Sequence, residues 1–350
     1  MGALERTVHT PADGDLLRAS TWPPHPTERR YNYAEGSNRL IASTQGDVAP
    51  TLAQSMRSAW YYHPTGVPLA QLQWPVKGTA TNRRTVYNLD RRPVAVYDND
   101  VLVPRYHYNS RSERIAKTVY PVGAAGTPMV HVSSRTPPRG ETTYSLYRDQ
   151  RLAAETDSAG NITTHYVYLY GKPVAKIDMA ANTSSTHSIW KALTMRSESD
   201  SSDTVAEIYA IVTDHLGTPQ EVLNENQHVV WQAVTAAFGQ ARITYATARA
   251  NSKPFEMNLR LPGQVFDAET KLNYNYLRDY DPTLGRYTAP DPVGVGGGTN
   301  PYAYVSNNPL TNVDPLGLYE EDIHYYMTYF LALAAGLDPR RAYIIATADQ

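Results

Sequence analysis

The 350-residue sequence contains no cysteine, which excludes disulfides, thiol catalysis and cysteine metal sites. Excess charge of either sign is also lacking: the formal net charge is -2, which gives no case for nucleic acid or an anionic membrane as a partner. The first residues do not place a basic segment before an apolar core, so no conventional signal peptide is predicted. The longest apolar stretch, residues 325–337, is too short to span a bilayer.

Tyrosine is abundant, with 27 residues against 4 phenylalanines, and the chain also holds 21 glycines and 25 prolines. Tyrosine favours strands whose faces are half exposed, and glycine and proline favour the turns between them. We therefore expect a mainly β fold of antiparallel hairpins, with a short helical segment at the C-terminal end.

A weak repeat begins near residue 81. Tyr87, Tyr108, Tyr147 and Tyr170 each end a predicted strand, and each is followed by a polar turn and the next apolar strand. Their spacing fits one or two units of about twenty residues, which is typical of stacked hairpins that need neighbours to bury their faces. The sequence thus predicts hairpins over residues 81–260, interrupted by an exposed serine-rich loop at 184–203. Residues 1–80 show no sustained period, although 32–44 and 60–72 contain candidate strands.

A second region, residues 261–318, concentrates charge and turn residues. Pro282 and Gly285 predict a tight turn between two short strands, because proline fixes φ and glycine accepts a positive φ. Folding back at this turn is expected to bring Asp279 near Asp291. Two carboxylates that share a site cannot both ionise cheaply, so such a pair can act as acid and base on a peptide bond.

Four motifs in this region closely resemble the repeat-associated core of the Rhs/YD-repeat family. They are Arg-Asp-Tyr-Asp-Pro-x-x-Gly-Arg-Tyr-x-x-x-Asp-Pro-x-Gly at 278–294, Gly-Gly-x-Asn-x-Tyr-x-Tyr at 297–304, Asn-Asn-Pro at 307–309 and Asp-Pro-Leu-Gly-Leu at 314–318. The hairpin repeats resemble the YD repeats of that family, and the run at 214–219 resembles the element that precedes its core. The family includes bacterial polymorphic toxins and the C component of insecticidal ABC toxin complexes.

The resemblance implies a β shell, or cage, around a C-terminal toxic domain, and a core that releases this domain by cutting the chain. Asp279 and Asp291 would be the carboxylates of a self-cleaving aspartyl protease, and Arg278 would stabilise charge at the site. The bond cut would join Leu318 to Tyr319, once in each molecule, and no cofactor would be needed. The run at 314–318 would be an intramolecular substrate at high effective concentration.

The same resemblance implies partners and a location. The partners would be the chain's own toxin segment, the remaining shell or a B-component-like subunit, a secretion apparatus such as a type VI system, and an immunity protein. The chain would be cytoplasmic before a dedicated system secretes it or delivers it to a target cell. Two departures from the family are visible: the four to seven repeats are fewer than a closed cage needs, and Val295 stands where leucine is common.

Residues 319–350 are expected to start a truncated, helical C-terminal domain. Asp322 and Asp338 are suitable N-caps, and Gly336 can end the first helix. His324 and Asp349 could belong to a metal site of the missing domain, but an ordinary helical face is the preferred interpretation of His324. The chemistry of this domain is not readable from its 32 residues.

Each candidate site also has a structural interpretation. Asp279 and Asp291 could cap turns and pair with arginine, Asp281 is expected to cap its turn, and Arg286 to form a salt bridge. His215 lies in a predicted turn, and the three glycines at 296–298 lack the lysine and helix of a phosphate-binding loop. Two alternatives to the autoprotease remain: a non-catalytic YD-repeat surface protein, and a β carrier for a C-terminal enzyme.

Overall fold

The computed structural model describes residues 29–45, 56–73, 79–121, 140–179, 206–245, 255–294, 299–318, 328–329 and 331–348. The chain divides into two compact units, one made of residues 1–105 and 120–138 and the other of residues 106–119 and 139–350. Of the predicted site residues, Tyr319, His324 and Asp349 lie outside the described residues.

The first unit is a set of antiparallel strands, each paired with the next strand in sequence. They are β1 (Arg29–Tyr33), β2 (Leu40–Gln45), β3 (Met56–Tyr62), β4 (Pro68–Gln73), β5 (Thr81–Tyr87), β6 (Pro93–Asp98) and the first part of β7 (Val101–Tyr108). Among the described residues, hairpins are already present over residues 29–73, where the sequence showed candidate strands but no sustained period. The core of this unit includes the buried residues Ala95, Leu102 and Tyr120.

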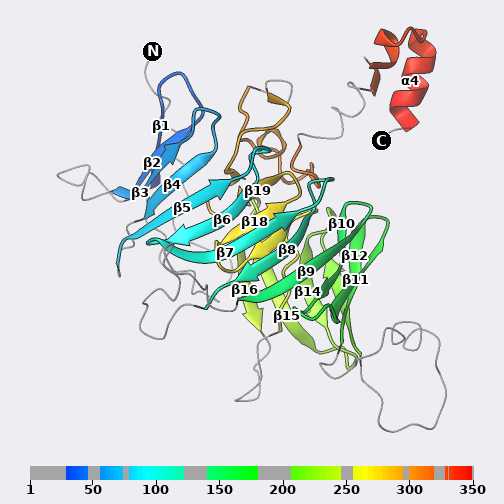
Figure 1. The fold of residues 1–350 in the computed structure, drawn as a ribbon. Coiled ribbons are helices and arrows are strands. Elements are labelled where there is room, and N and C mark those ends of the chain that lie inside the picture. The colour runs from blue at the N-terminus through cyan, green and yellow to red at the C-terminus, as the bar shows by residue number, and fades with distance from the viewer. Residues whose placement is uncertain are drawn as a thin grey trace, which may run out of the picture. The chain divides into compact units, whose positions relative to one another are not determined.

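The second unit continues the same antiparallel order. Its strands are β8 (Arg114–Val119), β9 (Glu141–Arg148), β10 (Arg151–Thr156), β11 (Ile162–Leu169), β12 (Lys172–Asp178), β13 (Glu207–Thr213), β14 (Pro219–Leu223), β15 (Val229–Thr235) and β16 (Ala241–Tyr245). Figure 1 shows them in colours from blue-green to yellow-green. Trp231 and Val222 are almost fully buried in its main apolar cluster. The predicted mainly β fold of antiparallel hairpins is confirmed.

Turn residues explain how one hairpin follows another. The carboxylate of Asp214 accepts hydrogen bonds from the backbone N–H groups of Leu216, Gly217 and Thr218 at 2.8 to 3.0 Å. Gly217 has φ +101°, a conformation that residues with a side chain rarely adopt. This is the turn expected there, and its neighbour His215 contacts the backbone oxygen of Leu310 at 2.8 Å.

A small four-stranded antiparallel sheet carries most of the charged core motif. It consists of β17 (Val265–Asp267), β18 (Leu272–Asn275), β19 (Arg278–Asp281) and β20 (Arg286–Tyr287), paired in that order. The expected turn joins β19 to β20: Gly285 has φ +66°, and Asp281 accepts hydrogen bonds from Thr283 and Leu284 as its cap. The rings of Tyr280, Tyr287 and Tyr304 pack against one another, with Tyr287 edge-on to each of the other two.

The C-terminal end is helical where it is described, in α4 (Pro339–Ala348). Asp338 caps this helix by accepting hydrogen bonds from the N–H groups of Arg340 and Arg341. The chain reaches the cap through Gly336, whose φ is +86°. In the described part of the chain no helix is both long and apolar enough to cross a membrane.

Candidate functional site

The site centres on Arg278, the first residue of β19, whose side chain is almost wholly buried. Its Nη2 lies 3.0 Å from Oδ2 of Asp291 and 3.3 Å from Oδ2 of Asp314. Removing one member of a buried cluster of an arginine and two carboxylates would leave a buried charge without its partner, which strongly destabilises the fold. Arg278 therefore brings Asp291, one acid of the predicted pair, together with Asp314, which belongs to the expected cleavage signal.

The segment at 314–318 lies along β18 and β19. Nε of Arg278 donates to the backbone oxygen of Gly317 at 2.5 Å, and the N–H of Leu277 donates to the oxygen of Leu316 at 3.1 Å. Asn275 donates its side-chain N–H to the oxygen of Asp314 at 2.9 Å. The segment is thus hydrogen-bonded along its length rather than lying as a free loop.

Glycine is required at position 317 by both conformation and space. Gly317 has φ +62°, and a Cβ there would lie 2.4 Å from the backbone oxygen of Asn275. No side chain fits at that distance without moving β18. The close approach places the next residue, Leu318, so that its N–H donates to Oδ1 of Asp314 at 3.0 Å.

Asp314 is 2% exposed, and burial raises the pKa of its carboxyl to about 6. Arg278 and hydrogen bonds from Tyr287 and Leu318 lower that pKa, whereas nearby Asp291 raises it. Because the folded-state pKa lies above the unfolded value, this group favours the fold at low pH. The contribution to folding stability is complete below about pH 4 and is lost as the pH rises through about 6.

Two neutral residues orient the Asp314 carboxyl. The hydroxyl of Tyr287 donates to Oδ2 of Asp314 at 2.6 Å and accepts a hydrogen bond from Nδ2 of Asn275 at 2.7 Å. The Tyr287 ring lies 3.5 Å beneath the guanidinium of Arg278. The sequence interpretation missed Asn275 and Tyr287, because a buried asparagine and a strand tyrosine are not distinctive in a chain rich in tyrosine.

Asp291 keeps capacity to accept a further proton donor. Its Oδ1 accepts the N–H of Val293 at 2.8 Å. Its Oδ2 is buried and, although near Arg278, accepts no aligned hydrogen bond from the described residues. A water molecule placed there could donate to this oxygen.

Asp279 has a different environment from Arg278. Successive side chains of a strand point to opposite faces, so the Asp279 side chain leaves β19 on the face opposite the Arg278 cluster. It is half-buried, and its backbone oxygen accepts hydrogen bonds from Thr288. The contacts therefore pair Asp291 with Asp314, which the sequence interpretation treated only as part of the cleavage signal. The signal that could have identified Asp314 is the motif Asp-Pro-x-Gly, which occurs at both 291–294 and 314–317.

The predicted accessory residues also have clear positions. The guanidinium of Arg286 lies over the ring of Tyr302, 4.5 Å from its centroid. Among the described residues there is no cluster of three or more histidine, aspartate or glutamate side chains that could hold a metal ion.

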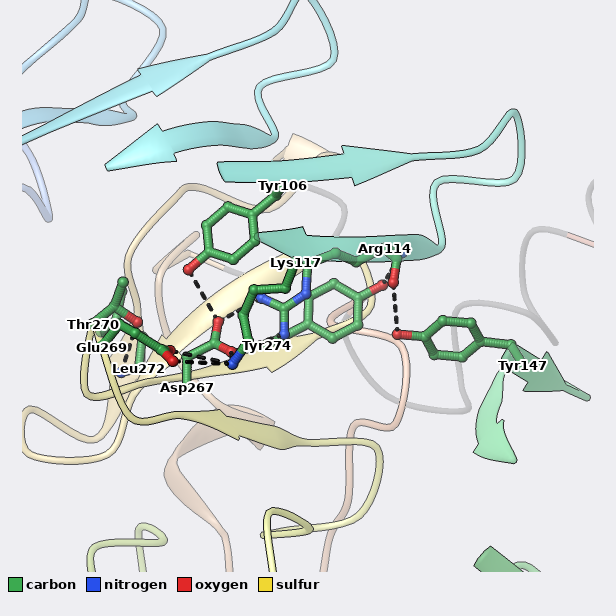
Figure 2. Close-up of polar contacts among 9 residues, drawn as sticks. All are labelled: Tyr106, Arg114, Lys117, Tyr147, Asp267, Glu269, Thr270, Leu272 and Tyr274. Atoms are coloured by element: carbon green, nitrogen blue, oxygen red, sulfur yellow. Dashed lines mark hydrogen bonds and ion pairs between the residues drawn. The ribbon is translucent and has the colours of Figure 1, made fainter. Parts of the chain in front are cut away.

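A second buried network fixes the small sheet to β7 and β8 (Figure 2). Asp267 of β17 accepts two hydrogen bonds from Arg114, one from Lys117 and one from Tyr106, at 2.5 to 3.1 Å. Burial acts to raise the pKa of Asp267, but Arg114 and Lys117 outweigh it, and the pKa is lowered. The N–H of Arg114 also donates to the hydroxyl of Tyr274 in β18 at 2.9 Å. These contacts position the sheet that carries the Arg278 cluster.

Comparison with protein families gives two matches. The family described as RHS protein matches residues 208–243, and a family of unknown function (DUF6765) matches residues 319–350. The first match covers β13 to β16, which are four of the repeating strands.

Individual relatives extend the similarity. Double-stranded DNA deaminase toxin A of Burkholderia cenocepacia is 32% identical over 256 residues, which are 72% of this chain and 16% of that protein. Toxin protein Tse5 of Pseudomonas aeruginosa is 40% identical over 113 residues, which are 32% of this chain and 8% of that protein. The chain thus spans less than a fifth of the length of these curated relatives.

Among solved structures, the crystal structure of TcdB2-TccC3 matches 83% of this chain and 16% of that one, with 16% identity and a TM-score of 0.45. The RHS match lies in the hairpins, and the relatives named above are toxins that share this part of the sequence. The protein belongs to the family of Rhs-repeat proteins.

Proposed function

We propose that this chain is the C-terminal part of an Rhs-type toxin shell, and that it cuts itself after Leu318 with Asp291 and Asp314 as the acid pair. The observation that carries the proposal is the convergence of both carboxylates on Arg278, beside a segment whose next bond is the expected cleavage site. Aspartic proteases use two carboxyl groups that share one proton.

The two carboxyl groups have different environments, which assigns their roles. Asp314, with a pKa raised to about 6, would hold the proton and donate it to the Leu318 carbonyl oxygen. Asp291, whose Oδ2 lies 3.0 Å from Nη2 of Arg278, would take a proton from a water as the water oxygen attacks the carbonyl carbon. Collapse of the tetrahedral intermediate breaks the C–N bond: Asp291 gives the proton it took from water to the leaving amine of Tyr319, a hydroxyl of the intermediate returns a proton to Asp314, and Leu318 keeps the new carboxyl group.

Positioning supplies much of the rate, because the substrate belongs to the same chain. Arg278 holds the Gly317 oxygen, and Asp314 holds the Leu318 N–H, at 2.5 and 3.0 Å. An intramolecular reactant held in a near-attack geometry reaches a very high effective concentration. The same contacts limit each molecule to a single turnover.

The test measures the intact mass of the full chain after expression, with Asp291→Asn, Asp314→Asn, Asp279→Asn and Asp281→Asn compared with wild type. Wild type should give fragments 1–318 and 319–350, and the first two variants should stay whole. Asp281 caps an exposed turn, so its variant is the matched control and should be cut normally.

The Asp279 variant decides between two carboxylate pairs. Normal cutting is expected, because its side chain leaves the opposite face of β19. Loss of cutting in Asp279→Asn with normal cutting in Asp314→Asn would restore the pair inferred from sequence. Equal cutting in all variants would reject an aspartyl mechanism.

A non-catalytic shell or surface protein is the second candidate. The observation that favours it is that Asp291 and Asp314 both form ion pairs with Arg278, as residues with only a structural role would. This function predicts an uncut wild-type chain and a lower melting temperature for both Asp291→Asn and Asp314→Asn. The proposal also includes encapsulation of a toxin, delivery by a secretion system and binding of an immunity protein.

A further inference from the structure

A pocket of about 240 Å³ lies on the other side of the 314–318 segment, within the second unit. Val313 and Pro315 form part of its wall, whereas the Asp314 side chain between them is directed to the Arg278 cluster. Gly263 lies against this wall so closely that a Cβ there would be 2.2 Å from the Pro315 oxygen. The pocket is therefore built into the sheet and the segment.

The pocket is lined by positive charge without an acid. Arg151, Lys172 and Arg260 line it, and none of its lining residues is an aspartate or a glutamate. Within the described residues, none of these three cations forms an ion pair: Lys172 donates to the backbone oxygen of His215, and Arg260 donates to the oxygens of Met257 and Leu259. Burial lowers the pKa of Arg260 to about 10, as expected for a cation without a counter-ion.

An unpaired donor also lines the pocket. Gln264 is 1% exposed, and its Oε1 accepts a hydrogen bond from Asn273 at 2.7 Å. Its Nε2 is buried and has no hydrogen-bond partner among the described residues. Leaving a buried donor unsatisfied costs about 1–3 kcal/mol, so a ligand that brings an acceptor oxygen would be favoured.

The rest of the lining is mostly apolar and includes five tyrosines, three of which are held by hydrogen bonds that their hydroxyls donate. Two of the pocket's tyrosines are pinned at their far ends, because Tyr168 donates its hydroxyl to the Leu152 oxygen and Tyr276 donates to the Arg111 oxygen. Tyr147 is pinned in the same way by the Arg114 oxygen. Because these three hydroxyls are engaged elsewhere, the three rings are free to contact an apolar part of a ligand. The tyrosine side chains are already held in place, so binding would cost little conformational entropy.

We propose that this pocket binds a small ligand with a carboxylate on an aromatic body. The carboxylate would meet the unpaired cations and the Gln264 amide, and the ring would pack among the tyrosines. The volume is below the roughly 300–1,000 Å³ of pockets for drug-sized ligands, so the ligand is of single-residue size. It could be a free aromatic acid or the C-terminal aromatic residue of a peptide.

The binding test uses the full chain carrying Asp291→Asn, which keeps it whole and lies outside the pocket. Phenylacetate and the peptide Gly-Gly-Phe are titrated separately, with phenylacetamide and the Gly-Gly-Phe amide as uncharged counterparts, while methyl NMR shifts of Leu216, Leu259 and Leu261 are followed. A Kd on the order of 1 mM is expected for the better acid, and at least about tenfold weaker binding for its amide. The acid that binds more tightly identifies the source.

Charge reversal locates the site. Arg151 is exposed, so Arg151→Glu should fold normally and weaken binding at least about tenfold, whereas Arg148→Glu, on an exposed arginine outside the pocket, should leave it unchanged. No saturable shift with either acid, equal binding of acid and amide, or unchanged binding to Arg151→Glu would each overturn the proposal.

A consequence for cutting rests on the proposed autoproteolysis. Because the ligand and the 314–318 segment share a wall, ligand binding should change the rate at which the wild-type chain is cut. Binding without any cutting would reject the autoprotease and leave the pocket assignment standing, so the two failures are distinguishable.

Discussion

Arg278 joins three parts of the chain through one planar group. Its guanidinium contacts Asp291 and Asp314 and donates to the Gly317 oxygen, while its face lies on the Tyr287 ring. Lysine has no such fork of donors and could not make these contacts together. From sequence, the density of charge around residue 278 could be predicted to matter, and Arg278 and Asp291 could be named. The partner acid, Asp314, was missed, because side-chain direction along β19 depends on strand register, which the turn alone did not define, and only the repeated Asp-Pro-x-Gly motif pointed to it.

Removing the Tyr287 hydroxyl should alter how cutting depends on pH. Burial raises the pKa of Asp314 to about 6, and the hydrogen bond from the Tyr287 hydroxyl acts in the opposite direction. Removing this hydroxyl in Tyr287→Phe should therefore raise the pKa of Asp314 above about 6. If protonated Asp314 is the acid, the wild-type rate falls as the pH rises through about 6, and the fall should move to higher pH in Tyr287→Phe. Rates from intact mass between pH 5 and 8 give the midpoint, and a shift to lower pH would contradict this role.

Gly317→Ala tests the close approach of the segment to β18. A Cβ at 2.4 Å from the Asn275 oxygen, in a backbone with φ +62°, should displace the segment, abolish cutting and lower the free energy of unfolding by more than about 2 kcal/mol. Gly160→Ala is the control, since Gly160 also has a positive φ but no atom within 4 Å of the added carbon. Thermal unfolding should show a clearly larger loss at position 317 than at position 160.

At the scale of elements, the hairpins follow from residues that the sequence displays. Asn109, Asp157 and Asp214 each start a turn and accept backbone N–H groups within the next four residues. Such local signals made the hairpins predictable. The tie between Asp267 and Arg114 was not predictable, since it joins residues 153 positions apart and neither belongs to a recognisable pattern.

Asp267→Asn should strongly destabilise the second unit. It leaves Arg114 buried without a counter-charge, which typically costs about 3–5 kcal/mol. The wild-type pKa of Asp267 is lowered, so its contribution is present above about pH 4 and is lost as the pH falls through the folded-state value. Chemical denaturation at pH 7 measures the loss. Asp149→Asn, which breaks an exposed contact with Arg148, should change stability by less than about 0.5 kcal/mol, and an equal effect of the two variants would refute the tie.

At the scale of the whole molecule, the described strands β1 and β16 each pair on one side only. Unpaired strand edges are templates for pairing with another chain. The chain studied alone should therefore associate as its concentration rises, which sedimentation velocity can measure. Tyr245→Lys, which places a charge at an exposed position of β16, should weaken that association, and an unchanged distribution would mean that this edge is not used.

The six hydrogen bonds that hold residues 314–318 in the described part of the chain all lie on the N-terminal side of the Leu318 carbonyl. If that carbonyl is where the chain parts, none of them is lost in the reaction. The newly formed terminus would stay bound beside Asp291 and Asp314 as a permanent product inhibitor, so a spent molecule could not attack foreign polypeptides or the fragment it has just released.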